Sequence, residues 1–164
     1  MKNAPVAPVA PVALFVYHRL SHTIRVVKSL QSNNLAYKTE LYVFSDGSKD
    51  DKVDGEVIRV REFIRNIQGF KKVNIIEQSN NIGLSASIIK GVTKVINDHG
   101  KVIVVEDDLQ CSPTFLSYMN AALDKYEKSD KVWHISGWNY PIDVSSKNSD
   151  AYFWRFMNCW GWAT

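Results

Sequence analysis

Residues 102–108 read Val-Ile-Val-Val-Glu-Asp-Asp, so the longest purely aliphatic run in the chain is followed at once by three acids. The aliphatic part lacks the polar alternation of a strand with one solvated face, and it is therefore typical of a strand buried on both faces of a parallel sheet. Gly100 precedes it and is expected to end a helix. We expect a central strand at residues 102–105 with carboxylates crowded at its carboxyl end.

Strand-like and helix-like segments alternate upstream and downstream of this run. Strands are expected at residues 12–17, 41–44, 73–77 and 132–136. Helical spacing of apolar residues covers residues 24–30, 60–67 and 88–96, and Ser112-Pro113 is expected to begin a further helix, with the serine as its cap. This alternation predicts an α/β fold with an open, mostly parallel sheet flanked by helices, in which ligands bind beyond the carboxyl ends of the strands.

The bulk composition is that of a soluble globular protein. The 164 residues are 45% hydrophobic and 23% charged, which suffices for one core. The net charge of +3 is spread along the chain, so no arm for nucleic acid is indicated. Cys111 and Cys159 lack metal-ligand spacing, which predicts free thiols in a reducing compartment. No stretch is long enough for a transmembrane segment, and we expect a cytoplasmic protein, with peripheral binding to a membrane left open.

The two ends of the sequence differ from its middle. Residues 1–11 carry Ala-Pro-Val repeats whose prolines favour an extended leader, so the domain is expected to span residues 12–164. The sequence stops abruptly at Thr164, and we interpret the chain as truncated at its C-terminus.

Aromatic residues dominate the last part of the chain, after Gly137. Phe153 and Phe156 are expected in the core. Trp138 and Trp160 suit two roles equally well, which are packing against the sheet and stacking on the apolar face of a sugar ring.

The acids that follow residues 102–105 are the first candidates for chemistry. Three carboxylates at one strand end repel one another unless a cation is bound, and hard oxygen ligands suit Mg²⁺ or Mn²⁺ held together with a substrate diphosphate. Strand alternation places Glu106 and Asp108 on one face, with Asp107 pointing away. A solvated acidic turn is the alternative to a metal site.

Other polar candidates follow the remaining strands. Asp46-Gly47 can accept hydrogen bonds from a base or ribose, although Asp-Gly is also an ordinary turn pair. Asn81-Ile82-Gly83 leads into a helix whose amino end favours phosphate, and a plain helix cap is the alternative. His18-Arg19 can meet phosphate or base, and a surface position explains this pair equally well.

Taken in order, four motifs resemble the GT-A fold of nucleotide-diphospho-sugar transferases. The motifs are Tyr17-His18-Arg19, Ser45-Asp46-Gly47-Ser48, Asn81-Ile82-Gly83-Leu84 and Glu106-Asp107-Asp108. The same order looks like that of family-two glycosyltransferases and of the N-acetylglucosaminyltransferase that starts complex N-glycan branching. The resemblance covers residues 12–164.

The resemblance implies transfer of a sugar from a nucleotide-diphospho-sugar donor to a hydroxyl of a glycan or lipid-linked acceptor, with inversion and with Mn²⁺ or Mg²⁺ on the diphosphate. It implies that Glu106-Asp107-Asp108 is a DxD-like motif in which Asp108 binds the metal, with the other two acids nearer the ribose and sugar. Asp46 would contact the nucleoside. The expected donor site also includes His18, Arg19, Gly47, Asn81 and Gly83, and the expected acceptor side includes Trp138, Asn139 and Trp160.

Two features depart from the family pattern. Ile89 stands where family-two enzymes often have asparagine, and no downstream acid matches the catalytic base, which is expected beyond Thr164. A noncatalytic nucleotide- or glycan-binding fragment of a degenerate transferase is therefore the alternative. A sugar nucleotidyltransferase is disfavoured because no Gly-rich loop follows the first strand, and neither GxGxxG nor GxxxxGK[ST] occurs.

Overall fold

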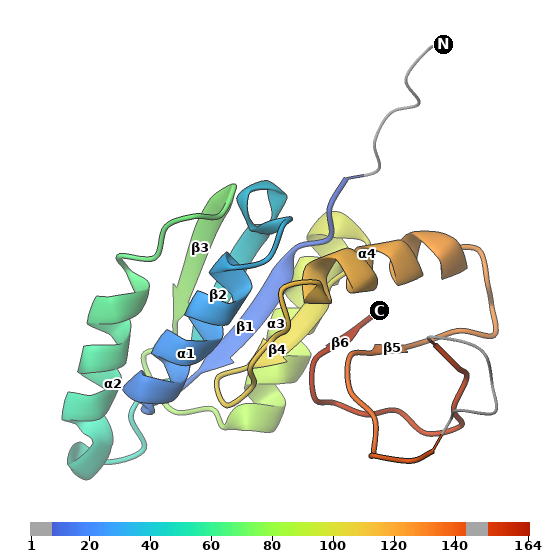
Figure 1. Cartoon of the computed structure of the whole chain (residues 1–164). Coiled ribbons are helices and arrows are strands. Elements are labelled where there is room, and N and C mark those ends of the chain that lie inside the picture. Colours follow the sequence, from blue (N-terminus) through green and yellow to red (C-terminus); the bar gives the residue numbers. More distant parts are fainter. Residues whose placement is uncertain (1–7, 144–150) are drawn as a thin grey trace.

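The computed structural model describes residues 8–143 and 151–164, which form an open sheet with helices on both faces (Figure 1). In chain order the elements are β1 (Val12–Val16), α1 (Leu20–Gln31), the short 3-10 helix η1 (Ala36–Lys38), β2 (Glu40–Ser45), α2 (Asp51–Ile64), β3 (Lys72–Glu77), α3 (Leu84–His99), β4 (Ile103–Glu106), α4 (Phe115–Tyr126), β5 (Ile135–Ser136) and β6 (Trp162–Ala163).

The strand order is β3-β2-β1-β4-β6-β5. Strands β1 to β4 run parallel to one another, whereas β6 is antiparallel to both of its neighbours, β4 and β5. This arrangement confirms the open, mostly parallel α/β sheet, and it places β4 between β1 and β6, in the interior of the sheet.

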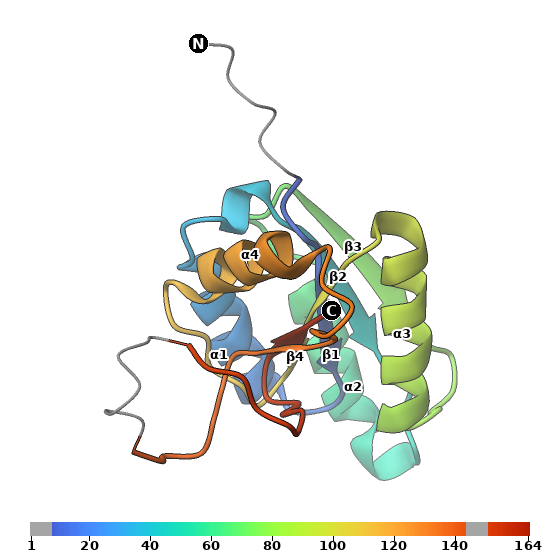
Figure 2. The ribbon, with the colours of Figure 1, turned by 90° about the vertical axis from the view of Figure 1, so that its right-hand side faces the viewer.

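Apolar side chains of the strands point alternately into two cores, one on each face of the sheet. Leu14 and Val43 pack on the face covered by α1, α2 and α4. Phe15 and Phe44 stack on each other at a centroid distance of 5.0 Å and pack on the face covered by α3. Figure 2 shows α3 across the sheet from α1 and α4. Both faces of β4 are thus buried, which explains its lack of polar alternation.

Several boundaries differ from the sequence prediction. Helix α4 begins at Phe115 because Ser112-Pro113 lies in a turn ahead of it, and Thr114 occupies the cap position without a side-chain capping bond. The strand expected at 132–136 is reduced to the two residues of β5. β6 was not expected, since a strand of two residues is too short to show an alternation of apolar and polar residues. Gly100 does end α3, in the left-handed conformation with φ 77°.

The folded core begins ahead of residue 12. Ala10 is fully buried, and its backbone N–H donates to Oδ1 of Asn120 at 2.8 Å. Pro11 is also buried, and its carbonyl oxygen accepts from the N–H of Ile103 at 2.9 Å. The end of the Ala-Pro-Val segment is therefore packed against β4 and α4, while residues 1–7 lie outside the described residues.

The expectation that Phe153 and Phe156 belong to the core is wrong. Their exposed fractions are 71% and 77%. Both lie in the irregular segment that leads to β6, and the sheet core is already filled by the helices and strands, so their apolar character alone did not decide their burial.

In the part of the chain that the structure describes, no helix has the length and apolar character needed to cross a bilayer.

Both cysteines are free, as predicted, but their environments differ. Burial raises the pKa of the Cys111 thiol to about 11, whereas Cys159 is exposed. Because the thiolate is the reactive form, we expect one thiol per folded chain to react rapidly with Ellman's reagent at about pH 8. Cys159→Ser should remove the rapid phase and Cys111→Ser should preserve it. Rapid reaction of both thiols would contradict this prediction.

Candidate functional site

A cavity of about 350 Å³ lies where the carboxyl ends of β1, β2 and β4 meet the amino end of α3. Open α/β sheets bind ligands at this edge, where polar loops follow the strands. The sequence-predicted residues that line it are His18, Arg19, Asp46, Asn81, Gly83, Glu106 and Asp107. The structure therefore gathers side chains from all four motifs around one space.

Sequence reasoning missed Lys49 and Ser87, which also line the cavity. Lys49 follows the Ser-Asp-Gly-Ser motif directly, so its position was available as a signal. Ser87 lies in the first turn of α3, where nothing in the sequence separates it from any other helical serine. Among the described residues, Oγ of Ser87 and Nδ1 of His18 are buried without a hydrogen-bond partner. Buried polar atoms are normally paired, so a ligand with donors or acceptors suits this cavity.

Asp46 joins the loop after β2 to the loop before α3. Its Oδ1 accepts hydrogen bonds from the backbone N–H groups of Gly47 and Ile82, and its Oδ2 accepts one from Gly83, each at 2.9 Å. The residue is only 7% exposed. In return, the side-chain amide of Asn81 donates to the carbonyl oxygen of Gly47 at 2.9 Å. Asp46 thus positions the amino end of α3, a task that local sequence could not reveal because its partners are 36 and 37 residues away.

Two glycines allow these loops to approach each other. A Cβ added to Gly47 would lie 2.4 Å from the backbone carbonyl carbon of Asn80, so the contact between the two loops excludes any side chain there. Gly83 has a φ of 80° at the cap position of α3, which side-chain-bearing residues rarely adopt. Gly47 thus lets the two loops touch, while Gly83 turns the backbone at the wall of the cavity.

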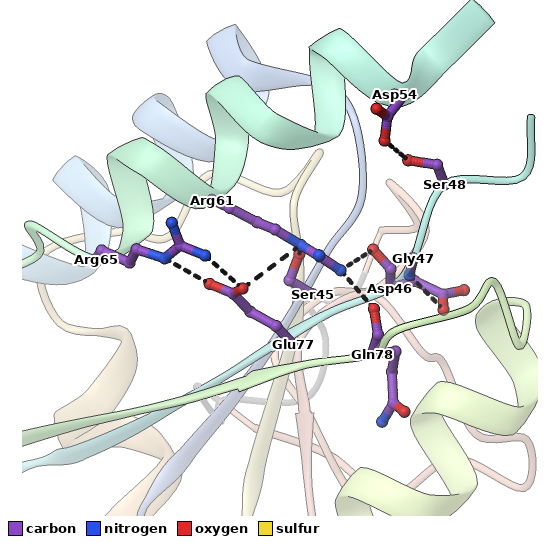
Figure 3. Close-up of polar contacts among 9 residues, drawn as sticks. All are labelled: Ser45, Asp46, Gly47, Ser48, Asp54, Arg61, Arg65, Glu77 and Gln78. Carbon is purple, nitrogen blue, oxygen red and sulfur yellow. Dashed lines mark hydrogen bonds and ion pairs between the residues drawn. The ribbon is translucent and has the colours of Figure 1, made fainter. Parts of the chain in front are cut away.

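Arg61 of α2 ties the carboxyl ends of β2 and β3 together (Figure 3). Its Nη2 donates to the carbonyl oxygens of Asp46 at 3.1 Å and Gln78 at 2.6 Å. Next to it, Arg65 forms two hydrogen bonds with the carboxylate of Glu77, at 2.8 and 2.6 Å. These contacts hold the carboxyl ends of two parallel strands level, so that the loops that follow them emerge at the same edge.

Arg19 bridges the acidic turn that follows β4. Its Nη2 donates a short hydrogen bond to Oδ1 of Asp107 and lies 3.2 Å from Oδ2 of Asp108. The expectation that Asp107 points away from Asp108 is wrong, because β4 ends at Glu106 and strand alternation does not extend into the turn. Asp107 is instead buried at the cavity wall, whereas the side chain of Asp108 is 47% exposed.

The acidic turn has oxygen donors of the kind that Mg²⁺ and Mn²⁺ prefer. Within residues 8–143 and 151–164, no three His, Cys, Asp or Glu side chains converge as a ready set of metal ligands. An ion that takes most of its ligands from water and a diphosphate needs only one or two carboxylates. Asp108 and its neighbours therefore fit a divalent ion, provided that the guanidinium of Arg19 moves away from the carboxylates.

Burial perturbs the carboxylates at the end of β4. It raises the pKa of Glu106, and repulsion from Asp108 and Asp107 raises that pKa further. Burial also raises the pKa of Asp107, although the hydrogen bond and charge of Arg19 oppose the change. The folded protein therefore disfavours the ionised form of both groups, and for Asp107 it does so even beside Arg19.

We expect Glu106→Gln to stabilise the protein in the absence of metal. Well below 4.5, the ordinary pKa of this group, wild type and variant carry the same charge at position 106 and should differ little. As pH rises through the raised folded-state pKa, the wild type must ionise a half-buried acid, so it loses stability relative to the variant. Thermal unfolding should give a higher melting temperature for the variant at neutral pH, with the difference shrinking in acid. A lower melting temperature for the variant at neutral pH would contradict this.

A second cavity, of about 700 Å³, lies beside the aromatic part of the chain. Trp138 and Asn139 line it. Trp160 packs on Trp138 at a centroid distance of 4.6 Å, and Tyr140 contacts Trp138 edge-on at a centroid distance of 5.0 Å. The two tryptophans thus pack on each other, with Trp160 52% exposed, and both roles considered for them stay predictions. Trp138 also remains available to the cavity.

Comparison with known proteins agrees with this architecture. The model of the GNT-I family matches residues 1–162. The mannosyltransferase PcManGT from Pyrobaculum calidifontis, solved in complex with GDP-Man and Mn²⁺, has a TM-score of 0.53 and 15% identity, over 80% of this chain and 36% of that one. TarS from S. aureus has a TM-score of 0.52 and 18% identity, over 71% of this chain and 20% of that one. A search of curated proteins returned no match.

At these identities the likeness to solved structures concerns the fold, and it confirms the GT-A-type sheet expected from the sequence. The chain spans about a third of the length of the mannosyltransferase and a fifth of the length of TarS.

Proposed function

The chain belongs to the GNT-I family, and from this premise we propose that it binds a nucleotide-diphospho-sugar for metal-dependent transfer of the sugar to an acceptor hydroxyl, with inversion at the anomeric carbon. One observation carries the proposal. Residues of four motifs that are far apart in the sequence line a single cavity at the carboxyl edge of a GT-A-type sheet. Family and fold both support a glycosyltransferase, while the donor, metal and stereochemistry belong to the proposal.

The proposed donor site divides into a phosphate side and a nucleoside side. Helix α3 begins at Leu84, and the positive end of its dipole, together with Lys49, favours binding of a diphosphate. His18 offers an unpaired ring nitrogen for the nucleoside, next to the loop that Asp46 positions. Gly83 contributes by turning the backbone at the cavity, and Gly47 contributes by letting the loops after β2 and before α3 touch. In this proposal Asn81 acts through the loop, since its amide already binds the carbonyl oxygen of Gly47.

The metal is proposed to bind at the acidic turn after β4. Asp108 is the most exposed of its three acids and is the proposed ligand for Mn²⁺ or Mg²⁺, with Glu106 and Asp107 facing the ribose and sugar. When bound, such an ion stabilises the negative charge that develops on the leaving diphosphate. The chain's own carboxylates hold the ion and orient the donor.

On the acceptor side, Trp138, Asn139 and Trp160 are the proposed contacts for a glycan or lipid-linked acceptor. The domain proposed to carry these sites comprises residues 12–164, with Ala10 and Pro11 packed against it.

Calorimetric titration of UDP and GDP, each with and without Mn²⁺, tests the donor site. We expect Mn²⁺-dependent binding of at least one nucleotide. We expect Asp108→Ala to weaken this binding by at least about tenfold, because the loss of a residue that only hydrogen-bonds a metal ligand already lowers metal affinity by that factor. Asp98→Ala is the matched control, since Asp98 is 46% exposed and pairs with Lys94 at 3.1 Å, much as Asp108 pairs with Arg19. Failure of both nucleotides to bind the folded protein, with or without metal, would overturn the proposed function.

A further inference from the structure

Arg19 occupies the acidic turn in a way that bears on metal binding. We propose that its guanidinium is an internal counter-cation of Asp107 and Asp108 that competes with the divalent ion at Asp108 and moves to the diphosphate when the ion binds. The consequence is that metal and nucleotide bind cooperatively through one side chain. This inference rests on the proposed function and adds to it a switch within the same site.

The backbone of Arg19 is anchored, while its side chain is partly exposed. Its carbonyl oxygen accepts hydrogen bonds from the N–H groups of His22 and Thr23, at 3.1 and 3.0 Å, and from Oγ1 of Thr23 at 3.1 Å. These bonds belong to the first turn of α1, directly after β1. The side chain itself is 42% exposed and reaches across to the turn after β4, the neighbouring parallel strand. A change of rotamer can therefore move the guanidinium without disturbing the helix.

The guanidinium fills the position from which a cation would neutralise the turn. One nitrogen, Nη2, serves carboxylate oxygens of both Asp107 and Asp108. Because this nitrogen lies 3.2 Å from Oδ2 of Asp108, an ion that binds the same oxygen meets a like charge at close range. Metal binding therefore requires Arg19 to leave, or else suffers its repulsion.

A bound diphosphate gives the displaced guanidinium a new partner. Arg19 lines the cavity proposed for the donor, and arginine forms paired hydrogen bonds with phosphate oxygens. Nucleotide binding would draw the guanidinium away from the carboxylates and so raise their affinity for the ion. Linkage requires the reverse effect as well, in which the ion releases Arg19 for the nucleotide.

The test is a titration of Mn²⁺ into nucleotide-free protein, with free Mn²⁺ followed by electron paramagnetic resonance. Arg19→Gln is expected to bind Mn²⁺ about three- to tenfold more tightly than wild type, the range appropriate to a partly screened charge. Arg25→Gln is the control, because Arg25 is exposed on α1, the helix that begins after Arg19, and its loss removes the same charge from the chain. It should match wild type. Arg19→Lys keeps the charge but places it on a more compact and more strongly hydrated ammonium group, so its Mn²⁺ affinity should lie between those of wild type and Arg19→Gln.

The second arm measures cooperativity. In Arg19→Gln, Mn²⁺ should increase the affinity for UDP or GDP by a smaller factor than in wild type, and nucleotide should increase the affinity for Mn²⁺ by that same smaller factor. The inference is overturned if folded Arg19→Gln and Arg19→Lys bind Mn²⁺ no more tightly than wild type, or if none of the proteins binds Mn²⁺. Tighter Mn²⁺ binding by the variants together with no nucleotide binding by wild type would instead sink the proposed function, while supporting the competition.

Discussion

Asp46→Ala is expected to lower the free energy of unfolding by about 3 kcal/mol, since it leaves the backbone N–H groups of Gly47, Ile82 and Gly83 without their acceptor in a largely buried setting. Unpaired buried donors cost more than the bonds themselves contribute. Urea unfolding measures the loss. Hydrogen exchange should show that the amides of residues 82 and 83 lose protection, and nucleotide affinity should fall because the amino end of α3 is no longer held at the cavity.

Asp50→Ala is the control for this prediction. Asp50 caps α2 and accepts one hydrogen bond, from the N–H of Lys52 at 3.0 Å, at an exposed site. Its loss should cost only about 1 kcal/mol and leave the amides of residues 82 and 83 protected. Equal destabilisation by the two substitutions, or unchanged exchange at residues 82 and 83 in Asp46→Ala, would show that Asp46 does not hold the loop.

Gly91→Ala and Gly55→Ala are expected to change stability in opposite directions, although both replace a glycine within a helix. A Cβ on Gly91 would lie 2.7 Å from ring atoms of Phe15 and 3.1 Å from Phe44, so either α3 or the stacked rings must shift. Overpacking of this kind costs about 1–3 kcal/mol. Nothing lies within 4 Å of a Cβ on Gly55, and there the better helix propensity of alanine should stabilise the protein by about 0.5–1 kcal/mol.

Urea unfolding of both variants measures the two effects. Because α3 carries the loop that contacts Asp46, Gly91→Ala should also weaken nucleotide binding, while Gly55→Ala should not. Stabilisation by both substitutions would mean that the stacked rings of Phe15 and Phe44 yield without cost, and that the packing of α3 does not set the position of the cavity.

The positions of the candidate site residues were largely predictable from sequence, because strand ends are local signals. The aliphatic run before Glu106 marks a strand, and the acids mark its end, so the edge of the sheet that carries the site follows from adjacent residues alone. The same holds for Asp46 after β2 and Arg19 after β1. What these residues contact was not predictable, because each contact joins different strand ends across the sheet.

The sequence by itself determined the order of the main helices and strands from β1 to α4, the parallel sheet with β4 in its interior and the edge that carries the candidate site, since periodicity, glycine positions and charge placement act over a few neighbouring residues. Only the tertiary structure decided that Arg19 neutralises Asp107 and Asp108, that Asp46 holds a loop 36 residues away, and that β6 inserts between β4 and β5. These features depend on which strands become neighbours. That choice is made by burial of whole faces, and short-range sequence patterns do not record it.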